Sequence, residues 1–256
     1  MTLMKKIFIL TIAIVMFLGG AVYAQNSWEK IKKNNEIKVG LCAAYPPFES
    51  RNENTGKLEG FDIDLANALA NELNIEANII DAEWQALLGG LIKGDYDILI
   101  TCMSKKEASV KNVNMSDVYY QLTNNIVVKE SENNIKSSAD LKNKVVGVQL
   151  GSGSEQVVDK LSGLKKVRRY NYNNEAFIDL KNGRIDAVVV GYAYAVNQLP
   201  NYDGLKIVEK PLKSADIVMV MKNGNDLLTK KINRALATLK EDGTYDQLVN
   251  KWLSVN

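Results

Sequence analysis

The spacing of hydrophobic and polar positions alternates between two periods, which predicts alternating strands and helices. Short apolar runs at residues 36–41, 75–80 and 97–101 are typical of strands, the last one fully buried. Between them, residues 61–73 repeat apolar side chains every four positions, as an amphipathic helix does. A second helix is predicted at residues 84–93, where a glycine follows. This order of elements favours an α/β fold.

The same alternation of strands and helices begins again near Ile126. Strands are predicted at residues 145–149, 167–172 and 185–190, and helices at 155–161 and 174–181. A late strand follows at 216–221, and residues 227–252 have a mostly helical pattern with a break at Gly243 and Thr244. Two series of alternating strands and helices, followed by one late strand and a helical segment, predict two lobes.

The first residues have the pattern of a secretory leader. Lys5 and Lys6 precede an apolar run at residues 7–18, and Val22 to Ala24 supply small side chains for cleavage. The run is too short for the roughly 20 residues that cross a bilayer. We therefore expect a signal peptide at residues 1–24 and a soluble protein in the periplasm or otherwise exported.

Charge and composition exclude several classes of protein. Lys and Arg total 32 against 30 Asp and Glu, and the excess of two lies in the leader, as Lys5 and Lys6. The rest of the chain therefore lacks the basic surplus of a nucleic-acid-binding protein. The chain has no His, which excludes Ser-His-Asp and Cys-His catalysis and His-ligated metals. We expect no cofactor and no metal.

A series of short motifs runs along the chain after the leader. They are Tyr45-Pro46-Pro47-Phe48, Gly60-Phe61-Asp62-Ile63-Asp64-Leu65-Ala66, Trp84 with Leu87-Leu88, Gly94-Asp95-Tyr96-Asp97, Met103-Ser104, Ser116-Asp117-Val118-Tyr119-Tyr120, Val146 to Ser152, Gly183-Arg184-Ile185-Asp186-Ala187, Asp242 to Tyr245, and Trp252. Each motif is weak alone, whereas their order and spacing are specific. Together they resemble one family, the polar amino-acid branch of the periplasmic solute-binding proteins of ABC importers.

The resemblance implies a two-lobed clamshell of the periplasmic-binding-protein type II. Lobe one would hold residues 25–122 and 214–256, and lobe two residues 123–213. The chain would cross at two hinges, near residues 122–126 and 211–215. A small molecule would bind between the lobes of a monomer, which would present it to a membrane permease.

Three contacts by which the family holds the head group of an amino acid are absent from this chain. The position of the Arg that pairs with the ligand carboxylate holds Ser109, and a Thr position in the same stretch holds Lys106. A second Thr position, in the lobe-two glycine loop, holds Gly153, and the Asp that takes the ammonium is replaced by Gly191. A carboxylate buried without a cation is costly. We therefore expect an atypical ligand. Lys105 or Lys106 either replaces the Arg charge or lies on an exposed loop.

The remaining candidates for ligand contacts are aromatic, small or uncharged. Such a site suits a neutral, aromatic or quaternary-amine solute. Tyr194 adds aromatic surface. The predicted ligand-binding residues are Cys42, Tyr45, Phe48, Trp84, Thr101, Cys102, Met103, Ser104, Ser109, Ser152, Gly153, Ser154, Gly191 and Tyr192.

The two cysteines leave three alternatives open. Cys42 and Cys102 each follow a predicted strand. They form a disulfide in an oxidising compartment, stay as buried thiols, or contact a ligand or metal.

The leading functional hypothesis is an exported binding protein for a small solute, not an enzyme. A dehydratase on the same fold is the alternative, because carboxyl groups such as Glu49, Glu83 and Glu107 could serve as a general acid. A receptor-linked sensor module is a third hypothesis.

Overall fold

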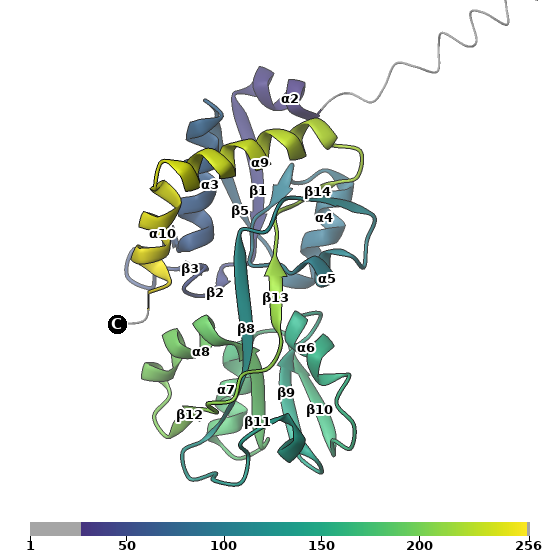
Figure 1. Cartoon of the computed structure of the whole chain (residues 1–256), viewed down its shortest axis with the longest axis vertical. Helices are drawn as coiled ribbons and strands as arrows, with labels where there is room; N and C mark the ends of the chain where they lie inside the picture. The colour runs from purple at the N-terminus through teal and green to yellow at the C-terminus, as the bar shows by residue number, and fades with distance from the viewer. Residues whose placement is uncertain (1–26, 255–256) are drawn as a thin grey trace, which may run out of the picture.

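The computed structural model describes residues 27–254, so the predicted signal peptide lies outside the described part. Two α/β lobes lie along the long axis of the molecule, and strands β8 and β13 connect them (Figure 1). This arrangement confirms the predicted fold class. Within residues 27–254, none of the helices combines the length and hydrophobicity needed to cross a membrane.

The sheet of the first lobe has the strand order β5-β1-β6-β14-β7. Strand β1 pairs in parallel with both β5 and β6, so the carboxyl ends of these strands lie at one edge of the sheet. A small antiparallel sheet, β2-β3-β4, lies beside it. The strands are β1 (Glu36–Leu41), β2 (Ala44–Tyr45), β3 (Glu49–Arg51), β4 (Leu58–Glu59), β5 (Glu76–Asp81), β6 (Ile98–Leu99), β7 (Val113–Met115) and β14 (Val220–Lys222).

Helices cover both faces of this sheet. On one face α2, α3 and α9 contribute to a core that includes Phe61, Leu65 and Leu236, and on the other face α4 contributes Leu87 and Leu91. The helices are α2 (Ser27–Asn34), α3 (Phe61–Glu72), the 3-10 turn η1 (Trp84–Ala86), α4 (Leu87–Lys93), α5 (Lys105–Ala108), α9 (Asp226–Glu241) and α10 (Thr244–Trp252).

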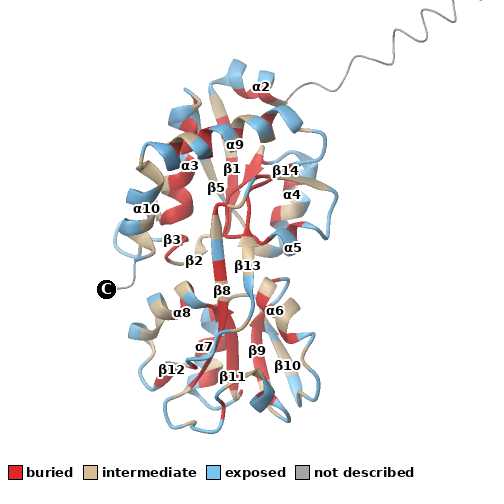
Figure 2. Cartoon of the chain, in the orientation of Figure 1, coloured by how far each residue is buried: buried red, intermediate tan, exposed pale blue. Residues whose placement is uncertain are grey.

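The sheet of the second lobe has the order β10-β9-β11-β8-β12. Strands β9, β10 and β11 are parallel, and β9 and β11 consist almost entirely of buried residues (Figure 2), which belong to two core clusters. Its elements are β8 (Tyr120–Lys129), η2 (Ser138–Leu141), β9 (Val145–Gln149), α6 (Gly153–Val158), β10 (Lys166–Tyr170), α7 (Asn173–Lys181), β11 (Ala187–Gly191), α8 (Tyr192–Gln198), η3 (Leu199–Asn201) and β12 (Leu205–Ile207).

Strand β8 runs from one lobe into the other. Its first residues pair with β13 (Ser214–Ile217), in the register Ser214 opposite Thr123, and its later residues pair with β11 and β12. The carboxyl ends of the parallel strands in the two lobes face each other across this connection (Figure 1). Ligands of open α/β sheets bind beyond such ends.

Several predicted elements differ from the observed ones. The strand expected at 216–221 is split into β13 and β14, because the chain leaves its pairing with β8 and joins β6 and β7. The strand expected at 97–101 is paired only at Ile98–Leu99, and Cys102 then adopts a left-handed backbone with φ of 43°. The helix expected at 84–93 begins with the 3-10 turn η1.

Candidate functional site

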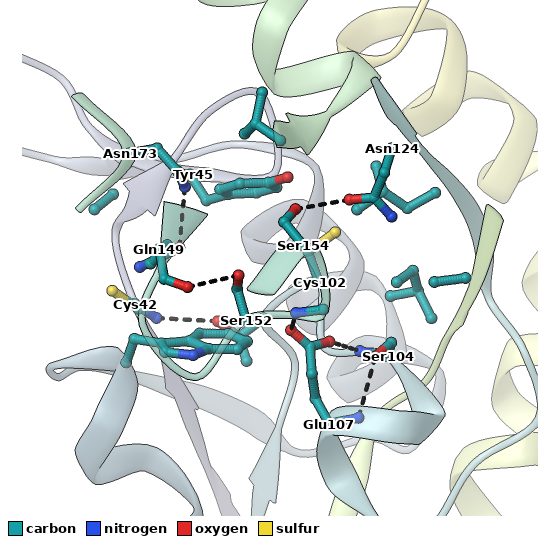
Figure 3. Close-up of a pocket in the computed structure, with 18 of the residues that line it drawn as sticks. Cys42, Tyr45, Cys102, Ser104, Glu107, Asn124, Gln149, Ser152, Ser154 and Asn173 are labelled. Carbon is teal, nitrogen blue, oxygen red and sulfur yellow. Dashed lines mark hydrogen bonds between the residues drawn. The ribbon is translucent and has the colours of Figure 1, made fainter. Parts of the chain in front are cut away.

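A cavity lies between the two lobes, at the carboxyl ends of the parallel strands (Figure 3). It encloses about 570 Å³ of space free of protein atoms, part of which is solvent at its mouth. Both lobes and both connecting strands contribute to its wall. The lining residues are Cys42, Ala44, Tyr45, Glu49, Trp84, Thr101, Cys102, Ser104, Glu107, Leu122, Asn124, Gln149, Ser152, Gly153, Ser154, Asn173, Val190, Ala215 and Ile217.

Thr101 fixes the strand ends that form the lobe-one wall. Its Oγ1 accepts a hydrogen bond from the backbone N–H of Cys42 at 3.1 Å and donates one to Glu49 Oε1 at 2.8 Å. Thr101 is therefore tied both to the end of β1 and to the small β2-β3-β4 sheet. Since all three residues are buried, these bonds are shielded from water and hold the wall in one geometry.

Behind this wall, Glu49 and Asp62 form a buried carboxyl pair. Burial raises the pKa of both, that of Asp62 to about 6, and the charge of the neighbouring Asp62 raises the pKa of Glu49 further. Glu49 Oε2 and Asp62 Oδ1 are buried and have no hydrogen-bond partner among the described residues. A single proton shared between the two carboxyls accounts for this arrangement, because two buried like charges in contact disfavour full ionisation.

Asp62 also supports the unusual backbone of Cys102. Its Oδ2 accepts hydrogen bonds from the Cys102 N–H at 2.6 Å and from the Tyr119 hydroxyl at 3.1 Å. These contacts hold the left-handed turn that directs residues 102–104 along the cavity.

Glu107 belongs to lobe one and reaches lobe two. Its Oε2 accepts the N–H of Ser104 at 2.6 Å, and its Oε1 accepts the N–H of Gly153. Ser104 Oγ in turn accepts the N–H of Glu107, which completes a capping box at the start of α5. Burial raises the pKa of Glu107, and the hydrogen bonds from Ser104 and Gly153 oppose that shift.

The wall of lobe two is a network of neutral polar groups. Ser154 Oγ donates to Asn124 Oδ1 at 2.7 Å, and Asn173 Nδ2 donates to Gln149 Oε1 at 2.9 Å. Ser152 Oγ donates to the Gln149 carbonyl at 2.7 Å and caps α6 by accepting the N–H of Glu155. These side chains are thereby held in place by partners within the protein.

Aromatic side chains bring the lobes into contact. The ring of Tyr45, in lobe one, stacks on that of Tyr194, in lobe two, with centroids 4.8 Å apart. The Tyr45 hydroxyl lies 2.2 Å from the position that a Cβ would take on Gly191, so this contact requires a glycine there. Trp84 reaches across in the same way, with Nε1 3.4 Å from the corresponding position on Gly151.

The structure brings together nine of the fourteen predicted ligand-binding residues around the cavity: Cys42, Tyr45, Trp84, Thr101, Cys102, Ser104, Ser152, Gly153 and Ser154. Their contact with a ligand stays a prediction.

The other five predicted residues do not line this cavity. Phe48 is fully buried in the core, where it packs on Phe61 and Tyr120, and Met103 is buried in the second core of lobe one. Ser109 is exposed, and its hydroxyl donates to the Lys105 carbonyl. Gly191 lies behind the Tyr45 hydroxyl, and Tyr192 is 40% exposed at the start of α8.

Neither lysine of the α5 stretch supplies the missing Arg charge. Lys105 Nζ pairs with Asp216 Oδ2 at 3.3 Å on the surface, and Lys106 is exposed. Among the described residues that line the cavity, none is Lys or Arg, whereas Glu49 and Glu107 are both present.

Sequence reasoning did not assign Glu49 and Glu107 to the ligand site, and it also missed Asn124, Gln149 and Asn173. A signal for Glu107 exists, because Ser104 and Glu107 have the spacing of a capping box. That spacing turns the Glu107 side chain back towards residue 104, at the end of a cavity-lining segment.

Both cysteines are buried free thiols, so the disulfide alternative is wrong for this structure. Burial raises the pKa of Cys42 to about 11 and raises that of Cys102 as well, so both are protonated at neutral pH. Within residues 27–254, no group of three or more Cys, Asp and Glu residues is placed to hold a metal ion.

A model of the bacterial extracellular solute-binding proteins, family 3, matches residues 37–255. The chain belongs to this family. The match spans both lobes and the connecting strands, and it confirms the family that the sequence motifs resemble.

Relatives of this family 3 protein are named as binding proteins. The ABC transporter arginine-binding protein 1 of Escherichia coli (strain K12) is 32% identical over 255 residues, covering 97% of this chain and 99% of the relative. An ancestral arginine-binding protein bound to arginine is 42% identical with a TM-score of 0.80, covering 86% of this chain and 99% of that structure.

A further structure bears on the enzymatic alternative. The ancestral amino acid-binding protein AncCDT-1, described as a precursor of cyclohexadienyl dehydratase, is 33% identical with a TM-score of 0.82, covering 90% of this chain and 100% of its own. This precursor is itself named a binding protein. The family and these relatives thus agree with the prediction of a solute-binding protein and not an enzyme.

Proposed function

We propose that this family 3 protein captures a small amino-acid-like solute outside the cytoplasm and delivers it, as a monomer, to the permease of an ABC importer. The observation that carries the proposal is the cavity, which is built from both lobes at their strand ends and is crossed by two connecting strands. A solute held there contacts both lobes and therefore favours the closed form, which a permease can distinguish from the open one.

We also propose the lobe limits drawn from the sequence, 25–122 with 214–256 and 123–213, and hinges near 122–126 and 211–215. The pairing of β8 with β13 at residues 120–123 and 214–217 supports this division. Beyond those residues β8 pairs only with strands of the second sheet.

The ligand differs from an ordinary α-amino acid. Position 109 holds an exposed Ser, and position 191 a Gly whose space is taken by the Tyr45 hydroxyl. The cavity therefore offers neither an Arg for a carboxylate nor an Asp at position 191 for an ammonium group. Its wall combines small neutral polar groups and two aromatic rings with aliphatic side chains and two glutamates.

Native mass spectrometry of protein purified from the cells that export it tests this function. A co-purified small molecule is the expected result, and the same molecule added to stripped protein should raise its melting temperature, because a ligand of the native state stabilises it. The proposal would be contradicted if the purified protein carries no small molecule and no compound in a broad metabolite screen raises its melting temperature.

A further inference from the structure

The two N–H groups bound by Glu107 come from opposite lobes. Ser104 N lies 2.6 Å from Glu107 Oε2 in lobe one, and Gly153 N donates to Glu107 Oε1 from lobe two. Both donor residues line the cavity, and Glu107 itself is only 7% exposed. Figure 3 shows the Glu107 carboxyl group beside Ser104. Backbone donors that converge on one point from two lobes form a place where a carboxylate is held strongly.

In this protein that place is already occupied by a carboxylate of the chain. A carboxylate on a ligand would have to displace Glu107 or lie beside it. In the second case two negative charges would share a buried space, where like charges repel strongly. Within the cavity wall no Lys or Arg is present to offset that repulsion, and Lys105 is engaged with Asp216 on the surface.

The rest of the wall favours positive charge. The Glu49–Asp62 pair lies behind Thr101 and Cys102, and a pair that shares one proton keeps one negative charge. Trp84 and Tyr45 also line the cavity, Tyr45 with one ring face stacked on Tyr194, and the free face of an aromatic ring attracts cations. Negative charge without a cationic partner, next to aromatic faces, is the chemistry that recognises an amine or a quaternary ammonium group.

We propose that Glu107 replaces the carboxylate of a ligand, and that the cavity binds a small organic cation that has no carboxylate of its own. The charged nitrogen of this cation lies near Glu107, and its apolar part lies against Trp84 and Tyr45. The inference rests on the proposed function, since it names the class of solute that the same cavity takes.

Matched pairs of compounds that differ in the carboxylate test the inference. Agmatine and arginine, cadaverine and lysine, histamine and histidine, and choline and glycine betaine are titrated into the stripped full-length mature protein by calorimetry. At least one cation should bind about tenfold or more tightly than its carboxylate-bearing partner, because only the latter places a second anion beside Glu107.

Variants at position 107 locate the effect. Glu107→Gln keeps the shape but removes the charge, and should weaken binding of the cation about tenfold. Glu107→Ala empties the position, and should strengthen binding of the carboxylate-bearing partner relative to the cation. Glu83→Gln is the control, because Glu83 also accepts an inter-lobe hydrogen bond, from Tyr172, but does not line this cavity. It should leave the preference within each pair unchanged.

Tighter binding of an amino acid than of its amine by the wild-type protein would overturn the inference and leave the proposed function intact. Unchanged affinity for the cation in Glu107→Gln would also overturn it, and circular dichroism of this conservative variant checks that it folds. If neither member of any pair binds and the purified protein carries no solute, the proposed function fails together with the inference.

Discussion

The carboxyl groups near the cavity differ in charge because their hydrogen-bond partners differ. Glu107 accepts two backbone N–H groups, which favour its ionised form, whereas Glu49 faces the carboxyl of Asp62. Glu49 therefore keeps a proton that it would lose in water, and the pair carries less charge than its composition implies. Glu107, Glu49 and Asp62 thus differ in protonation because each carboxyl group faces different partners.

Glu49→Gln should change how stability depends on pH. The pKa of Glu49 is raised in the native state, so the native protein binds more protons than the unfolded chain above about pH 4.5, and this contribution to stability is lost as the pH rises. Gln donates to Asp62 without taking up a proton. The free energy of unfolding of the variant minus that of wild type should therefore increase by about 1.4 kcal/mol for each unit of rising pH, up to the native pKa of Glu49.

Urea unfolding at pH 4.5 and pH 7 measures this difference. Glu53→Gln is the control, because Glu53 is an exposed glutamate in the loop between β3 and β4. Parallel pH profiles for wild type and Glu49→Gln would show that Glu49 does not hold an extra proton.

Individual site residues were predictable where they directly follow a strand. Cys42, Thr101 and Cys102 come after β1 and β6, so their place at the strand ends follows from the pattern of apolar residues. Glu107 could not be placed in this way, since its position depends on an N–H from lobe two, far away in the sequence. Ser109 was included because of a motif position, yet the turn at the end of α5 directs its hydroxyl to Lys105.

At the scale of elements, two short strands bounded by turn residues were predicted most accurately. The predicted limits of β1 and β9 agree with the structure at every residue, because each is a short run bounded by turn residues. Helix α8 was missed, since the Tyr-Ala-Tyr-Ala sequence at its start alternates as a strand does. The split of β13 from β14 depends on a change of partner strand, which local sequence does not encode.

Alanine substitutions at the two adjacent glycines of α4 should change the stability of the protein in opposite directions. A Cβ on Gly89 would meet nothing within 4 Å, so Gly89→Ala should stabilise the protein by about 0.5–1 kcal/mol through higher helix propensity. A Cβ on Gly90 would lie 2.6 Å from the ring of Tyr96, so Gly90→Ala should destabilise it by about 1–3 kcal/mol. Thermal and urea unfolding measure both, and equal effects would contradict the packing described for α4.

At the scale of the whole molecule, side-chain contacts join the two lobes. Glu107 with Gly153, Tyr172 with Glu83, and the stacked rings of Tyr45 and Tyr194 each join one lobe to the other. The two-lobed plan was predictable from the repeated strand–helix rhythm and the family motifs. The closed arrangement was not, because it depends on side chains that meet only after both lobes have folded.

Gly191→Ala should favour the open form. The added Cβ would lie 2.2 Å from the Tyr45 hydroxyl and 3.0 Å from Leu122, so Tyr45 must leave its place on Tyr194. Closure should become less favourable by about 1–3 kcal/mol, with a corresponding loss of ligand affinity. Small-angle X-ray scattering should show a larger radius of gyration, whereas the control Gly89→Ala should match wild type. An unchanged radius and affinity would mean that this contact does not limit closure.

The continuous course of β8 has a mechanical consequence. A narrow ribbon of two hydrogen-bonded strands flexes easily across its thin direction but resists stretching along its length and sideways bending within its own plane. If the lobes open at the proposed hinges, the distance between the lobe ends that β8 and β13 join would stay nearly constant while the far ends of the lobes separate. A permease that contacts the far ends of both lobes would then meet them along the same arc for every solute.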